Sequence, residues 1–174
     1  MSNYLDLCKK HNIPVSANVI GSSGENIAKA ILEYFPVFRV VFLGEKFPVV
    51  DFYVEIEEDN KSYPFLVQVK ATTSKLTKRK YLRVSVPKGK YESLHKKPIP
   101  TYVGGVHLDS STLYITPTNT EKEKLSSIAP ICILSLDNKE RTLESVTRIK
   151  YDVIAYWDSL NAFDKKLVFK SRIL

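Results

Sequence analysis

The 174-residue sequence is poor in the residues that several protein classes require. Its two cysteines, Cys8 and Cys132, lie far apart and form no CxxC pair, so a CxxC zinc site is excluded and a disulfide framework is not expected. The six glycines form neither GxxxxGK[ST] nor GxGxxG, which argues against a P-loop and a dinucleotide-binding fingerprint. The three histidines are scattered and do not pair at ligand spacing, so a zinc site of His and Cys is not expected either.

Long apolar runs are also missing. The most apolar stretch, residues 35–43, is interrupted by Pro36 and Arg39, whereas a membrane-spanning helix needs roughly 18 apolar residues. The first residues show no basic region followed by an apolar stretch, so no signal peptide is visible. We therefore expect a soluble, cytoplasmic protein of a reducing compartment, without a membrane partner.

The composition is that of an ordinary globular protein, with 44% hydrophobic and 26% charged residues, and the length fits one domain spanning residues 1–174. The formal net charge of +7 is unevenly distributed, because residues 70–97 hold ten basic residues and one acid. That stretch carries +9 and leaves −2 for the rest of the chain. Such a concentrated basic block suits a polyanion, most often nucleic acid, although a solvated lysine-rich surface is the simpler alternative.

The first half of the sequence predicts helices followed by strands. Residues 2–20 indicate a short leading helix, and the spacing of Ser22 and Glu25 is that of a capping box, which predicts a second helix that begins near Ser22 and ends before Pro36. Residues 37–43, 49–57 and 63–71 have strand character, and residues 59–62 have the composition of a hairpin turn.

The second half predicts further elements around the same sheet. We expect a strand at 81–86, a short helix at 88–95, and strands at 101–108, 112–116 and 129–136, followed by one or two closing helices from Tyr151 onward. The order of helix, strands and helices predicts an α/β (α+β) fold, with a mixed central sheet flanked by helices.

Polar residues gather on two of the predicted strands. Gln68 and Lys70 stand two apart and therefore share one face of their strand, while Asp51 would lie beside Gln68 if the two strands form a hairpin. A carboxylate and a second oxygen ligand suit Mg²⁺, which binds one or two carboxylates together with waters and a substrate phosphate. A nearby lysine can then offset the charge that develops on that phosphate.

Asp51 followed by Gln68-Val69-Lys70 resembles the motif of the PD-(D/E)XK, or restriction-endonuclease-like, nuclease superfamily. The likeness covers residues 21–116, with residues 129–174 packed on that core, and is strongest to small prokaryotic domains that carry Q-x-K in place of (D/E)-x-K. It implies a metal-dependent endonuclease in which Asp51, Gln68 and the backbone carbonyl of Val69 hold Mg²⁺ or Mn²⁺. It further implies that Lys70 assists the attacking water and that Glu25, on the preceding helix, completes the site.

The chain departs from the family pattern at two positions. Pro48 stands three residues before Asp51, and Gln68 replaces an acid, so the site has less negative charge and should hold a metal more weakly. The basic residues after the motif would grip the phosphate backbone of nucleic acid, with DNA favoured over RNA. These residues are Lys75, Lys78, Arg79, Lys80, Arg83, Lys88 and Lys90.

Structural explanations exist for the same residues. Glu25 would suit the third position of a capped helix, Asp51 could satisfy a turn, and Lys70 could extend from a strand end toward solvent. Two other functions are therefore open: a nucleic-acid-binding module that kept the fold and lost catalysis, and a protein-interaction subunit of a defence or restriction system. A homodimer is one arrangement that would let a nuclease of this kind cut two strands.

Overall fold

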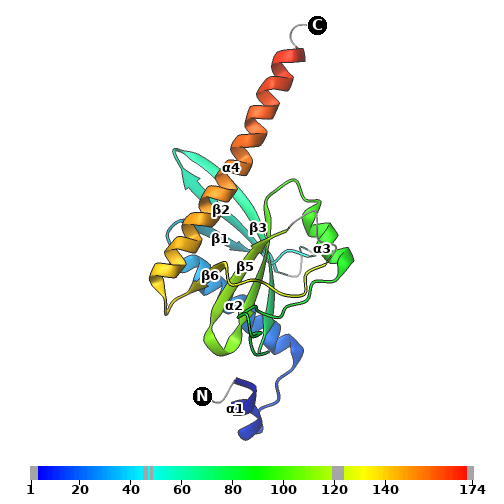
Figure 1. Ribbon diagram of the computed structural model, residues 1–174, viewed down its shortest axis with the longest axis vertical. Helices are drawn as coiled ribbons and strands as arrows, with labels where there is room; N and C mark the ends of the chain where they lie inside the picture. The colour runs from blue at the N-terminus through cyan, green and yellow to red at the C-terminus, as the bar shows by residue number, and fades with distance from the viewer. Residues whose placement is uncertain (1–3, 45–46, 48, 119–123, 172–174) are drawn as a thin grey trace.

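The computed structural model describes residues 4–44, 47, 49–118 and 124–171, with only the course of the main chain for residues 4–5 and 161–171. Its centre is a six-stranded mixed sheet with the strand order β1-β2-β3-β4-β5-β6, in which β3 and β4 are parallel and all other neighbours are antiparallel (Figure 1). The α+β class is therefore confirmed. The elements are α1 (Tyr4–Lys10), α2 (Ala17–Tyr34), β1 (Phe38–Phe42), β2 (Phe52–Glu58), β3 (Lys61–Thr72), α3 (Lys88–His95), β4 (Thr101–His107), a 3₁₀ turn (Leu108–Ser110), β5 (Thr112–Pro117), β6 (Cys132–Ser135) and α4 (Lys139–Ser171).

The hairpin of β2 and β3 is formed as the sequence predicts. Glu58 pairs with Lys61, so the turn contains only Asp59 and Asn60, whose φ values of 50° and 60° are those of a two-residue hairpin turn. Along β2, Phe52, Val54 and Ile56 are buried while the alternate residues are more exposed. This alternation fixes which side chains of the hairpin enter the core.

The two faces of the sheet are covered by different structures. On the helical face, α2 and α4 pack with residues such as Ile31 and Ile149 against Phe65 and Val67. On the opposite face, which we call the loop face, α3 and the extended segment 81–87 cover Leu66, Val103, Tyr114 and Ile133. Because side chains alternate along β3, Val67 and Val69 belong to the helical face, whereas Gln68 and Lys70 belong to the loop face.

Helix α2 begins earlier than the capping-box pattern predicts. The N-cap is Ser16, whose hydroxyl accepts a hydrogen bond from the backbone N–H of Val19 at 3.3 Å, and the predicted start near Ser22 is wrong. The Ser22 hydroxyl instead donates to the carbonyl of Asn18 at 3.0 Å, within the helix. Glu25 consequently lies in the middle of α2 and has no capping role.

Gly24 lets α2 approach β3 very closely. A Cβ atom at Gly24 would overlap the Cβ of Ala71, whereas a Cβ at Gly21, in the same helix, would meet nothing within 4 Å. We expect Gly24→Ala to lower the free energy of unfolding by about 1–3 kcal/mol, because the backbones must separate. The control Gly21→Ala should raise it by about 1 kcal/mol through helix propensity. Urea unfolding of the two variants measures the difference, and equal stabilities would show that the close contact is not needed.

Three other elements differ from the sequence-based prediction. Residues 81–86 form isolated bridges, Leu82 to Ile128 and Val86 to Leu125, and no strand of the sheet. The C-terminal region is one helix that starts at Lys139, twelve residues before the predicted Tyr151. β6 is shorter than predicted, while α3 has the predicted bounds.

Helix α4 is anchored to the sheet and then projects from the body of the protein (Figure 1). The indole N–H of Trp157 donates to the carbonyl of Pro64 in β3 at 2.8 Å, and the ammonium of Lys150 lies 2.7 Å from a carboxylate oxygen of Glu58. Among the described residues, no helix combines the length and the apolar character that crossing a bilayer requires.

The outer edge of β6 is covered by hydroxyl groups of α4. Thr142, which is fully buried, places its Oγ1 2.8 Å from both the N and the O of Ser135. The hydroxyl of Ser145 accepts from the backbone N–H of Ile133 at 2.9 Å. Side chains one helical turn apart thus satisfy an edge strand that would otherwise expose unpaired backbone groups.

Candidate active site

Asp51, Gln68 and Val69 come together where β2 begins opposite the C-terminal half of β3. The backbone N–H of Asp51 donates to the carbonyl of Val67 at 3.0 Å, which places Asp51 across from Gln68. One carboxylate oxygen of Asp51, Oδ2, accepts from the backbone N–H of Val69 at 2.5 Å and from Nε2 of Gln68 at 2.6 Å. The convergence that the hairpin predicted is therefore present.

The local chain path explains why a carboxylate lies here. Backbone groups alternate between the two sides of a strand, and those of Val67 and Val69 face β2. Strand β2 starts only at Phe52, after a residue with a φ of 79° at Val49, so no strand residue of β2 lies opposite Val69. The Asp51 carboxylate and the Gln68 amide take the place of the missing backbone partners.

The Gln68 side chain is only 7% exposed, and its amide has a defined direction. Nε2 donates to Asp51 Oδ2 and also to the carbonyl oxygen of Val69 at 3.1 Å. Both partners are acceptors, so only the NH₂ end of the amide can face them. Among the described residues, every fully buried side-chain N or O atom has a hydrogen-bond partner. The Oε1 atom of Gln68 has no partner among these residues, so it is not fully buried and reaches solvent.

Two lysines, Lys70 and Lys90, place positive charge near the Asp51 carboxylate. Burial raises the pKa of Asp51 above its ordinary value of 3.8, while the Val69 N–H and the ammonium groups of Lys70 and Lys90 lower it. Lys70 is half-buried, and within the described part of the chain its ammonium forms neither a hydrogen bond nor an ion pair. An ammonium group that is near a carboxylate but bonded to no other group can contact a phosphate that binds there.

The basic residues predicted to bind nucleic acid are all exposed and come from the segments that cover the loop face. In the extended segment, Leu82 and Val84 point into the core while Arg83 points outward, and α3 contributes Lys90 near Asp51. The proximity of Lys90 to the carboxylate was not apparent from the sequence, because it depends on how α3 packs. The full exposed set is Lys75, Lys78, Arg79, Lys80, Arg83, Lys88 and Lys90.

Glu25 is half-buried on α2, the helix that packs on the helical face, whereas Gln68 and Lys70 point to the loop face. It follows Gly24, which contacts Ala71, so Glu25 lies close to the end of β3 where the site is built. Its contribution to a metal site stays a prediction. Glu55, which shares a face with Asp51, is engaged elsewhere: it accepts from the hydroxyl of Tyr53 at 2.7 Å, and this bond raises the pKa of Tyr53 to about 12.

The donor atoms at this site match a hard divalent cation in kind. Asp51 supplies carboxylate oxygens, Val69 a carbonyl oxygen, and Gln68 an amide oxygen once its amide is turned. Among the described residues, no three or more His, Cys, Asp or Glu side chains gather in an arrangement that could hold a metal. A cation here would therefore have Asp51 as its anionic ligand and would keep several waters.

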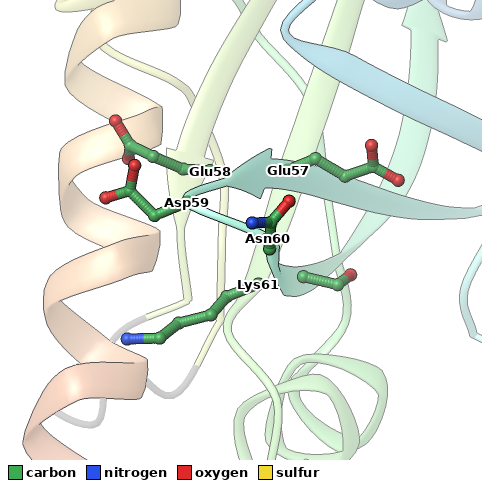
Figure 2. A pocket seen from close by; sticks show the side chains of 6 residues that line it. Glu57, Glu58, Asp59, Asn60 and Lys61 are labelled. Atoms are coloured by element: carbon green, nitrogen blue, oxygen red, sulfur yellow. The ribbon is translucent and has the colours of Figure 1, made fainter.

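A separate hollow of about 400 Å³ lies around the β2–β3 turn, lined by residues 57–62 (Figure 2). Glu57, Glu58 and Asp59 make this lining acidic, and Lys150 of α4 pairs with Glu58. The hollow lies at the opposite end of β3 from Lys70 and carries the wrong charge for a phosphate backbone. It is therefore not part of the candidate site.

The chain matches no protein-family model, and no curated protein matches it. The candidate site therefore stands on the geometry of Asp51, Gln68, Val69 and Lys70, together with the basic surface beside them.

Proposed function

We propose that the protein is a metal-dependent phosphodiesterase that acts on nucleic acid through a restriction-endonuclease-like core. The observation that carries this proposal is the convergence of Asp51, Gln68 and Val69 beside the Lys70 ammonium, which has no hydrogen-bond or ion-pair partner among the described residues. The exposed basic segments cover the same face of the sheet, so a bound phosphate backbone would run past these residues. DNA is the favoured substrate, as the motif resemblance implies.

Each residue has a distinct part in this proposal. Asp51, the Val69 carbonyl and Gln68 would hold Mg²⁺ or Mn²⁺, which polarises the phosphate and lowers the pKa of a bound water. Lys70 would lie against the scissile phosphate, where its charge stabilises the negative charge of the transition state. Glu25 would bind through water or orient Lys70, and the lysines and arginines from Lys75 to Lys90 would hold the backbone without reading the sequence.

Lys70→Ala tests the catalytic assignment. Incubation of the purified protein with DNA and Mg²⁺ or Mn²⁺ should give cleavage that falls by at least about 100-fold in the variant, because a charge that faces the transition state is lost. DNA binding should change little, since many other basic residues contribute. Lys61→Ala, at the other end of β3, removes the same charge and should cleave at the wild-type rate. Equal rates for wild type and Lys70→Ala would refute the assigned site.

One observation favours a second function, a non-catalytic nucleic-acid-binding module on the same fold. The Gln68 amide already bonds to Asp51 Oδ2 and to the Val69 carbonyl, two of the oxygens that a metal would need. The same assay separates the two functions, because a pure binding module would retain DNA in a salt-sensitive way and release no cleavage product with either metal.

A further inference from the structure

The Gln68 amide bridges two oxygen atoms, one in the carboxylate of Asp51, just before β2, and the other in the backbone carbonyl of Val69, within β3. Its Nε2 lies 2.6 Å from Asp51 Oδ2 and 3.1 Å from the Val69 carbonyl oxygen, so one NH₂ group uses both of its hydrogens. The same NH₂ group occupies the position from which a cation would contact both oxygens. The Gln68 NH₂ group and a cation therefore cannot both lie between Asp51 Oδ2 and the Val69 carbonyl oxygen.

The competition can be resolved by the side chain itself. The oxygen and nitrogen of a Gln amide have nearly the same shape, so a half-turn about the last side-chain torsion exchanges them without repacking, and that torsion is a soft one. After the half-turn, Oε1 faces the space between Asp51 Oδ2 and the Val69 carbonyl. Three oxygens in contact repel one another unless a cation lies among them, so the turned state needs a cation.

We propose that Gln68 is a gate for the cation site, with its amide closed over Asp51 and Val69 in the cation-free protein and turned when a divalent cation enters. The inference rests on the proposed function for the identity of the ligand, but not for the closed state, which the hydrogen bonds define. Because Gln68 is 7% exposed, the amide has few alternative partners and the choice is between these two orientations. In a chain with an acid at this position, no such closed state would form, since a carboxylate cannot donate to Asp51.

The sequence makes this gate measurable, because Gln68 is the one glutamine among the 174 residues. Selective ¹⁵N labelling of glutamine side chains in the full chain gives a single pair of NH₂ signals. Without added metal, these signals should lie downfield, as expected for hydrogen-bonded protons, and exchange slowly with water. Addition of Mg²⁺ alone should move them upfield, toward the position of a free amide, and speed their exchange.

Asp51→Ala is the control, because its Gln68 signals should start closer to the free position and should not respond to Mg²⁺. Wild-type signals that stay unchanged in millimolar Mg²⁺ would overturn the gate. A DNA cleavage assay in the same buffer separates the two proposals. A Gln68 response without cleavage supports the gate and contradicts the phosphodiesterase, while Mg²⁺-dependent cleavage without a response contradicts the gate alone. Absence of both contradicts both.

Discussion

Replacing Asp51 should abolish metal-dependent cleavage whether the new residue is Ala or Asn. In the proposed site Asp51 would be the anionic ligand, so either change would remove the charge that holds the cation, and the cleavage rate should fall by at least about 100-fold. Cleavage of DNA over time in Mg²⁺ and in Mn²⁺ measures the effect. A variant that cuts at the wild-type rate would show that the metal, if any, is held elsewhere.

The two Asp51 variants should nevertheless differ in stability. Asn at position 51 still offers one oxygen to the Val69 N–H and to Gln68 Nε2, whereas Ala leaves both donors without an acceptor. We expect Asp51→Ala to be less stable than Asp51→Asn by about 1–3 kcal/mol, the usual penalty for unpaired buried polar groups. Urea unfolding of the two variants measures this difference, and equal stability would mean that water satisfies the donors.

The difference in stability between the Asp51→Asn variant and the wild type should depend on pH in a definite direction. Burial raises the pKa of Asp51 above 3.8, so the fold favours the neutral carboxyl and the wild type loses stability as pH rises through that pKa. The ionisation of Asp51 therefore does not change the free energy of unfolding below pH 3.8, and it lowers that free energy by its full amount above the pKa of the folded state. The Asp51→Asn variant lacks this ionisation, so its advantage over wild type should grow with pH in this range and then level off. An advantage that shrinks as pH rises would contradict the raised pKa.

A triple substitution of Lys78, Arg79 and Lys80 to Ala should weaken DNA binding by a large factor. These residues are exposed in the loop that follows β3, and each phosphate contact contributes about 0.9 to the slope of log K against log salt. Three lost contacts should lower that slope by about 2.7, which is a loss of roughly 500-fold in affinity at 0.1 M salt. Fluorescence anisotropy of a labelled duplex over a salt series measures both quantities.

A control variant with three other lysines replaced has the same net charge as the first triple variant. Lys9, Lys10 and Lys61 are also exposed, but Lys9 and Lys10 belong to α1, and Lys61 is the first residue of β3, at the opposite end of that strand from Lys70. Changing these three to Ala removes the same charge, and the affinity should stay within a few-fold of wild type. Equal losses in the two triple variants would mean that net charge, and not the basic surface beside Asp51, governs binding.

Short-range patterns predicted much of the fold because the features behind them are local. The alternation in β2 and the Asp59-Asn60 turn specify the hairpin, and α3 has the bounds expected from the sequence. The start of α2 was mispredicted because Ser16 and Ser22 are both acceptable caps, and the helix runs through both glycines, with Gly24 packed against Ala71. Such a contact joins distant parts of the chain and leaves no local pattern.

In the candidate site, too, some features follow from local sequence patterns and others depend on contacts between distant residues. The hairpin register placed Asp51 beside Gln68, and the two-residue period placed Lys70 on the same face, so the convergence was predictable. The direction of the Gln68 amide was not, because it depends on the carbonyl of Val69, which lies opposite no residue of β2 and accepts from Gln68 Nε2 instead. The position of Lys90 likewise depends on the packing of α3 over the sheet.

The hydroxyl groups of Thr142 and Ser145 have a consequence for how this sheet can meet another protein. They bond the N–H of Ile133 and both backbone groups of Ser135, so a further strand could pair with β6 only by displacing α4. As far as the described residues go, the other end of the sheet is β1, a five-residue strand with no neighbour on its outer side. A strand contributed by another molecule would therefore extend the sheet in one direction only, beside Phe38–Phe42.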